Sequence, residues 1–179
     1  MMRMGAKGKN MKKLYKINID TELGDMTAIA TDAGICLLDF SDNKTLELKI
    51  RQLQNTLKTE IIEDSNPHLD HLLLELTEYF EGKRKIFDVS LDLIGTDFQK
   101  EVWLSLNKIP YGETISYLEQ ARLLGKPSAV RAVANANGKN KISIILPCHR
   151  VVGWDGSLTG YGGGLWRKKR LLEMENAGL

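Results

Sequence analysis

Hydrophobic and polar residues alternate in short runs over the first part of the chain. Residues 13–40, KLYKINIDTELGDMTAIATDAGICLLDF, are β-prone and are divided at Gly24 and Gly34, a pattern typical of a meander or of hairpins. Over residues 66–83 the apolar residues take a helical spacing. Pro67 stands at the favoured first position of this predicted helix. The apolar stripe of this predicted helix consists of Leu69, Leu72, Leu73, Leu76 and Phe80.

The run IFDVSLDL, residues 86–93, predicts one more strand before the pattern changes at Gly95. Residues 96–110 predict a helix that begins with a capping box, in which Thr96 is followed three positions later by Gln99. Its apolar stripe consists of Phe98, Val102, Trp103 and Leu106.

Two short helices are predicted next, the first capped by Ser116 with Glu119 and the second opening after Pro127. A pair of helices joined by a glycine-containing turn is typical of a helix-turn-helix, although many helical hairpins bind nothing. Three further segments follow: an apolar strand-like run at 142–146, a glycine-rich loop at 153–164 and an amphipathic helix at 165–178.

The composition predicts a globular protein with one large domain or two small ones, since 42% of the 179 residues are hydrophobic. No run is long enough to cross a membrane, and the basic start lacks the apolar core of a signal peptide. We expect residues 1–10 to form a disordered arm. Two cysteines cannot build a disulfide framework, which favours a reducing compartment, and we expect a cytoplasmic protein.

Charge is distributed unevenly between the two halves of the chain. Residues 1–95 carry 13 Lys and Arg against 16 Asp and Glu, a net charge of −3, whereas residues 96–179 carry 12 against 7, a net charge of +5. The basic half therefore favours an anionic partner, although a difference of this size also arises by chance.

Two other sets of reactive residues favour structural roles. Cys36 lies inside the apolar run ICLLDF, where a buried and inert strand cysteine is expected. His68 and His71 are one helical turn apart, but no cysteine or carboxylate cluster completes a tetrahedral set around them. We expect solvent-facing histidines and no bound metal.

The run SIILPCHRVVG places Cys148 directly before His149. A thiol is a good nucleophile only as a thiolate, and a neighbouring histidine, acting directly or through a water, commonly provides it. Neighbours in an extended chain point to opposite sides, so this pair needs a turn or a bridging water, and Glu173 or Glu175 could orient the imidazole. A structural cysteine after a strand is the alternative, and these residues alone leave both open.

Five motifs carry a resemblance to a known family: FQKEVW, IPYGETISY, GKPSAVRAVANAN, LPCHRVVG and LTGYGGGLWRKKRLLEME. In this order they resemble the DNA-binding and catalytic domain of the O6-alkylguanine-DNA alkyltransferases. The resemblance implies an α+β protein with a small N-terminal sheet-plus-helix domain of ribonuclease H-like type over 11–93. A mostly helical domain with a helix-turn-helix would follow over 94–179.

The resemblance implies DNA repair by single-use transfer of an alkyl group from O6-alkylguanine to Cys148 after the damaged nucleotide is flipped out, with O4-alkylthymine open as a second substrate. His149 would deprotonate the thiol through a water, and Glu175 would hold the imidazole tautomer. Asn140 would brace the turn before the motif, and Tyr117 would donate a hydrogen bond to guanine N3. No cofactor is implied, and the zinc site of some members has no ligand set here.

The resemblance also implies residues that recognise the base and the DNA. The carbonyls of Cys148 and Val151 would read the exocyclic amine, and the Gly162 amide would reach O6, with Tyr161 in the same substrate-binding loop. Arg131 would fill the gap left by the flipped nucleotide. Small residues would allow a monomer to approach the minor groove of double-stranded DNA. The further DNA-binding residues are Ser128, Ala132, Ala136 and Tyr117.

Two positions depart from the family pattern, and three other functions compete. Lys141 stands where the family usually has proline, and Trp154 is large for its loop, where it could narrow the pocket toward methyl or lie on the surface. A non-catalytic alkylated-DNA-binding relative would replace Cys148, often by tryptophan. A Cys-His hydrolase would need an oxyanion hole and a peptide cleft. A regulator would add a cysteine-rich domain.

Overall fold

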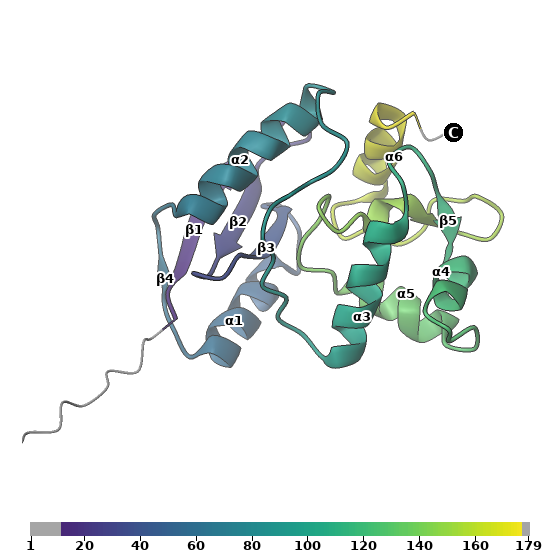
Figure 1. The fold of residues 1–179 in the computed structure, drawn as a ribbon, viewed down its shortest axis with the longest axis horizontal. Coiled ribbons are helices and arrows are strands. Elements are labelled where there is room, and N and C mark those ends of the chain that lie inside the picture. The colour runs from purple at the N-terminus through teal and green to yellow at the C-terminus, as the bar shows by residue number, and fades with distance from the viewer. Residues whose placement is uncertain (1–11, 177–179) are drawn as a thin grey trace, which may run out of the picture.

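The computed structural model describes residues 12–176, so the predicted arm at 1–10 lies outside the described residues. The first half contains β1 (Leu14–Ile19), β2 (Met26–Ala30), β3 (Ile35–Phe40), α1 (Leu46–Leu57), β4 (Ile61–Ile62) and α2 (Pro67–Phe80) (Figure 1). The sheet order is β3-β2-β1-β4, with antiparallel β1–β2 and β2–β3 pairs and a parallel β1–β4 pair. The predicted meander is therefore confirmed.

The helices α1 and α2 pack on opposite faces of this sheet. The α2 residues Leu69, Leu72 and Leu76 join a cluster with Met26 and Ala28, and Phe80 packs against it, as predicted. Leu73 is 43% exposed, so its place in the predicted stripe is wrong. The α1 face was not predicted, although Leu46, Ile50, Leu53 and Leu57 recur at helical spacing; its cluster includes Leu14, Ile29 and Cys36. Cys36 is a buried strand residue, as predicted.

Two predicted strands are wrong, for one physical reason. Within the described part of the chain, residues 86–93 form only one bridge, between Leu91 and Ile35, and residues 142–146 form turns with a single bridge between Ile142 and Leu38. Both bridges lie on the free edge of β3. Short pieces of chain therefore cover that edge in place of a full strand, which also protects it from pairing with other chains.

The second half contains α3 (Asp97–Ser105), α4 (Tyr117–Leu123), α5 (Val130–Gly138) and α6 (Leu165–Met174), with 3-10 turns at Leu106–Lys108 and Cys148–Arg150. Both predicted capping boxes are present, at Thr96 with Gln99 and at Ser116 with Glu119. The short strands β5 (Ile115–Ser116) and β6 (Val151–Val152) pair with each other in parallel, and this pairing joins the start of α4 to the segment after the Cys148–Arg150 turn.

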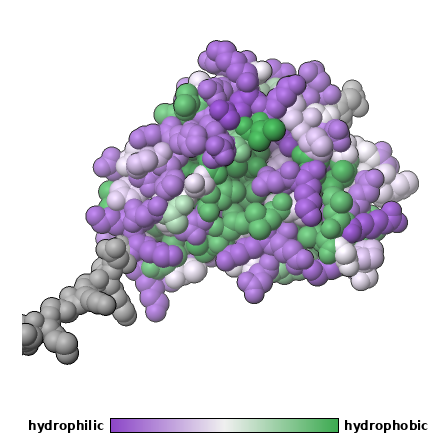
Figure 2. All heavy atoms as spheres, viewed as in Figure 1, coloured by the Kyte–Doolittle hydropathy of each residue, from purple (hydrophilic) through white to green (hydrophobic). Residues whose placement is uncertain are grey.

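The two halves share one hydrophobic core. Its main cluster joins Phe40 and Leu72 of the first half to Trp103, Leu146 and Leu171 of the second. Polar side chains cover most of the face in Figure 2, and apolar ones gather in its centre, between the halves. Among residues 12–176, no helix has the length and apolar character needed to cross a membrane. The α+β architecture is confirmed, whereas the division into 11–93 and 94–179 stays a prediction.

Candidate active site

Cys148 is held at the start of a tight turn that follows α5. The Asn140 side chain spans the preceding loop, because its Nδ2 donates to the Leu146 carbonyl at 2.9 Å and its Oδ1 accepts from the Ile142 amide at 3.0 Å. The chain then enters the 3-10 turn Cys148–Arg150. This is the turn that the adjacent Cys148 and His149 require, and Asn140 lies where it can brace it.

His149 and Glu175 form a fully buried pair. The His149 Nε2 and Glu175 Oε1 atoms are 2.9 Å apart, and neither side chain is exposed to solvent. An ionised carboxylate only accepts hydrogen bonds, so we assign the imidazole proton to Nε2. The Nδ1 atom has no hydrogen-bond partner within the described part of the chain, and its lone pair is free to take a proton.

The Glu175 carboxylate also anchors two other side chains. The Tyr79 hydroxyl from α2 donates to Oε1 at 2.7 Å, and the Arg150 guanidinium donates to Oε2 at 2.9 Å and to Oε1 at 3.0 Å. Orientation of His149 and an ion pair with Arg150 therefore occur together at Glu175 in this structure.

Burial and hydrogen bonding set the protonation states of the three residues. Burial lowers the pKa of His149, which keeps the imidazole neutral near pH 7. Burial opposes ionisation of Glu175, but hydrogen bonds from His149 and Arg150 outweigh it and lower its pKa far below the usual range. Burial raises the pKa of Cys148, although Asn140, Lys168 and Lys49 act in the opposite direction. The resting thiol is therefore protonated and needs a base.

The residues expected to bind the flipped guanine lie around the 3-10 turn at Cys148. Pairing of Ser116 with Val152 brings Tyr117, the first residue of α4, beside the strand that follows Cys148. The Tyr117 hydroxyl donates to the Thr159 carbonyl at 3.1 Å. Tyr117, Cys148 and Tyr161 all pack against the main core cluster.

The glycine-rich loop packs tightly against the first half. A Cβ atom on Gly162 would lie 2.9 Å from the Asn43 side chain, and one on Gly163 would lie 2.7 Å from the Phe40 ring. A larger residue at either position would have to displace the Asn43 side chain or the Phe40 ring, because the loop closely approaches β3 and the turn after it. Trp154, in the same loop, is 90% exposed, so its side chain lies on the surface.

Lys168 is a site residue that sequence reasoning missed. Its side chain is fully buried, and its Nζ donates to the carbonyls of Val151 at 2.6 Å and Thr159 at 2.7 Å. Burial lowers its pKa to about 8. The sequence signal was its place three and four positions before the buried Leu171 and Leu172 of α6. The Val151 carbonyl predicted to read the base thus already accepts one hydrogen bond and retains a second lone pair.

The residues expected to contact DNA divide between two faces of the α5 region. Ser128, Arg131 and Ala132 are exposed. Ala136 is 4% exposed, packs in a cluster with Val102 and Val133, and accepts a hydrogen bond from Trp103 through its carbonyl. The prediction that Ala136 lies at the DNA surface is therefore wrong, because it falls on the core-facing side of the helix.

No cluster of three or more metal-ligating side chains occurs among residues 12–176. The two histidines of α2 have separate partners: His68 contacts the Asp32 carbonyl, and His71 contacts the Glu75 carboxylate.

Comparison with known families covers both halves. The family described as 6-O-methylguanine DNA methyltransferase, DNA binding domain, matches residues 97–177, and its ribonuclease-like domain matches residues 14–93. The chain belongs to the 6-O-methylguanine DNA methyltransferase family. The resemblance inferred from the five motifs is confirmed.

Several members of this methyltransferase family are similar over most of the chain. A methylated-DNA–protein-cysteine methyltransferase of Methanosarcina barkeri is 41% identical over 93% of this chain and 99% of its own length. One from Mycobacterium tuberculosis is 59% identical over 103 residues, and the match spans 62% of that relative. The crystal structure of the M. tuberculosis O6-methylguanine methyltransferase has a TM-score of 0.78 at 40% identity, covering 92% of this chain and 93% of that one. The M. tuberculosis protein has also been solved in complex with DNA, and that structure has a TM-score of 0.77.

Proposed function

We propose that this protein repairs DNA by moving the alkyl group of O6-alkylguanine to Cys148. The observation that carries the proposal is the buried His149–Glu175 pair, with its free Nδ1, directly after the cysteine. The name of the relatives, methylated-DNA–protein-cysteine methyltransferase, supports the same reaction. Retention of Cys148 beside this pair argues against a non-catalytic alkylated-DNA-binding role.

The transfer is a displacement at carbon. A water passes the Cys148 proton to His149 Nδ1, and Glu175 stabilises the imidazolium that forms. The thiolate sulfur then bonds to the alkyl carbon while the bond from that carbon to guanine O6 breaks, and the bonding pair leaves with the base. The Tyr117 hydroxyl transfers its proton to N3, so that guanine departs neutral, and solvent carries the proton held by His149 back to the tyrosinate. The product thioether has no leaving group that water can displace, so each molecule reacts once.

The base reaches Cys148 only after it has left the duplex. Flipping costs a few kcal/mol, and insertion of Arg131 from α5 into the gap offsets part of it. The exposed Ser128 and Ala132 lie in the same region and support approach to the minor groove. Closure of loop 153–164 would bring the Gly162 amide to O6 and the carbonyls of Cys148 and Val151 to the exocyclic amine. One protein molecule bound to one lesion suffices for every step.

The test is the stoichiometry and the position of the transferred group. Wild-type protein mixed with excess O6-methylguanine duplex should gain one methyl group by intact mass, and peptide mapping should place it on Cys148. Cys148→Ser should gain none while it still binds the duplex, because phosphate contacts supply most of the affinity. Cys36 is an internal control, since burial raises its pKa to about 12. Methyl on Cys36, transfer by the variant, or several turnovers per molecule would overturn the proposal.

A further inference from the structure

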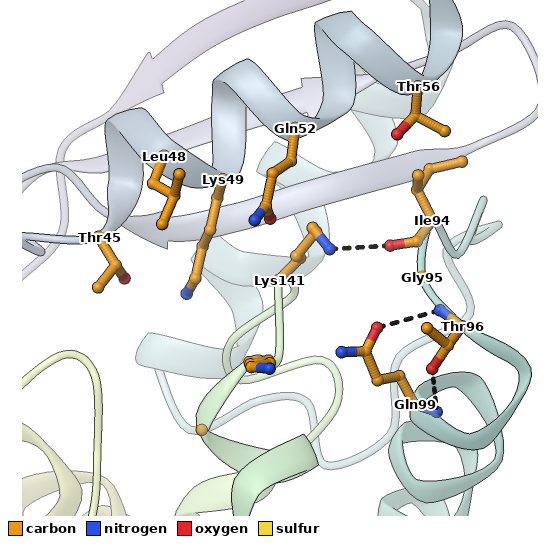
Figure 3. A pocket seen from close by; sticks show the side chains of 12 residues that line it. Thr45, Leu48, Lys49, Gln52, Thr56, Ile94, Gly95, Thr96, Gln99 and Lys141 are labelled. Atoms are coloured by element: carbon orange, nitrogen blue, oxygen red, sulfur yellow. Dashed lines mark hydrogen bonds between the residues drawn. The ribbon is translucent and has the colours of Figure 1, made fainter.

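A cavity of about 550 Å³ lies between α1 and the start of the helical half, and Cys148 is not among its lining residues. Figure 3 shows α1 on one side and the segment leading into α3 on the other, with Lys49 extending from α1 into the space between them. The lining contains three lysines and no carboxylate: Thr45, Leu48, Lys49, Gln52, Thr56, Ile94, Gly95, Thr96, Gln99, Gly138, Lys139 and Lys141.

Among the residues that the structure describes, only one of these three lysines has a counterion. Lys49 Nζ lies 2.6 Å from Asp39 Oδ2, so this pair is neutral. Lys141 is 8% exposed, and its Nζ donates to the Ile94 carbonyl at 2.9 Å (Figure 3) and lies 5.2 Å from the centre of the Trp103 ring. Within residues 12–176, no carboxylate lies within ion-pair distance of Lys141 or of the exposed Lys139.

A buried ammonium without a counterion is unfavourable, and proteins usually pair such a charge. Burial lowers the pKa of Lys141, and repulsion from Lys49 and Lys139 lowers it further. An anion in the cavity would give Lys141 a counterion, and it would offset the effects of burial and of repulsion from Lys49 and Lys139 on its pKa. The cavity thus has the electrostatic character of an anion site that the chain itself does not fill.

We propose that this cavity binds a phosphate group carried by a nucleotide, with Lys141 and Lys139 as its cations. Its volume is within the range of about 300–1,000 Å³ that is typical of small-molecule sites. Leu48 and Ile94 provide apolar wall, and Gln52 and Thr56 provide an amide and a hydroxyl for a sugar or base. The phosphate can come from a free nucleotide or from a DNA strand that passes the protein.

The test is calorimetric titration of the whole chain with adenosine monophosphate, inorganic phosphate and adenosine. The monophosphate should bind, and adenosine should bind about tenfold more weakly or not at all, because one charge-assisted contact supplies roughly that factor. Lys141→Met keeps the aliphatic stem and removes the charge, and it should weaken the monophosphate by about tenfold or more. Lys169→Met is the matched control, since that lysine is exposed on α6 and does not line the cavity.

Two further arms complete the experiment. If an undamaged duplex displaces the monophosphate, the site binds the phosphates of the DNA backbone. If the duplex does not displace it, the site binds free nucleotides. Both results support the phosphate site. Lys139→Gln serves as a second variant, and thermal melting shows whether Lys141→Met is folded. The inference would be overturned if the monophosphate does not bind to wild type, or if wild type, Lys141→Met and Lys139→Gln bind it with equal affinity. The titration uses no alkylated DNA, so it can fail while methyl transfer to Cys148 succeeds, and the reverse.

Discussion

Replacement of Glu175 by glutamine tests the central pair most directly. The side chain keeps its size, loses its charge, and exchanges one acceptor oxygen for a donor. In the structure, the carboxylate accepts hydrogen bonds from Tyr79, His149 and Arg150 at 2.7–3.0 Å in a site where Glu175 is 2% exposed. Glu175→Gln should therefore affect both stability and chemistry.

The loss of stability follows from Arg150, which is 6% exposed and would have no counterion. Removing one partner of a buried ion pair costs about 3–5 kcal/mol. Arg150 would still donate to the Ile109 carbonyl at 2.7 Å and lie 5.7 Å from the centre of the Tyr111 ring, so we expect the lower end, about 3 kcal/mol. In a chain of this size, that lowers the melting temperature by about 6–12 °C.

The dependence of this loss on pH has a definite sign. The folded-state pKa of Glu175 lies below its unfolded value of about 4.3. Its contribution to stability is thus present above that value and is lost as the pH falls through the folded pKa. The difference in melting temperature between wild type and Glu175→Gln should be full at pH 7 and should narrow below about pH 4.

The chemical effect acts through His149. The hydrogen bond and negative charge of Glu175 raise the pKa of His149 against the effect of burial, so their removal makes the imidazole a weaker base. Cys148 must then ionise with less help. Transfer by Glu175→Gln should be slower, and its rate should rise at higher pH than in wild type.

The control is Arg150→Met, which removes the ion pair and keeps the contact between His149 and Glu175. It should lower the melting temperature, but its pH profile should not move upward, because Arg150 itself lowers the pKa of His149. The assay follows single-turnover methyl transfer from O6-methylguanine duplex across pH, below the melting temperature of each variant. If Glu175→Gln is less stable but keeps the wild-type rate and pH profile, Glu175 has only a structural role.

Two other variants test the DNA contact and the loop. Arg131→Ala should slow repair of duplex far more than reaction with free O6-methylguanine, which needs no flipping; equal losses would show that Arg131 serves the fold. Lys168→Met deprives the Val151 and Thr159 carbonyls of their donor, so it should cost about 1–3 kcal/mol per unsatisfied group and speed hydrogen exchange in residues 153–164. If exchange in this loop stays as slow as in wild type, Lys168 does not hold the loop in place. Lys169→Met is the control.

Elements specified by local sequence were predicted best. The capping boxes at Thr96 and Ser116 and the stripe of α2 depend on residues three or four positions apart, and the structure contains both boxes and all of the stripe except Leu73. The runs at 86–93 and 142–146 have the composition of strands, but composition does not determine whether a full partner strand is available. In the described chain, each run pairs with β3 through a single β-bridge, at Ile35 or at Leu38.

The predicted site residues came from the motif, and the structure adds contacts that no motif contains. A lysine in a sequence is expected at the surface, yet Lys49, Lys141 and Lys168 are all at most 8% exposed. Their burial depends on the meeting of segments nearly a hundred residues apart, as between Lys49 and the Asn140 carbonyl at 3.0 Å. Such pairs have no signal within a local window.

These contacts join the N-terminal half to the candidate active site. Tyr79 of α2 donates to the carboxylate that holds His149, and Lys49 of α1 bonds the carbonyl of Asn140, whose side chain braces the loop before Cys148. Lys49 also helps to lower the pKa of Cys148, together with Lys168 from the other half. The basicity of His149 and the acidity of Cys148 are therefore set jointly by the two halves, although the residues proposed to react all come from the second.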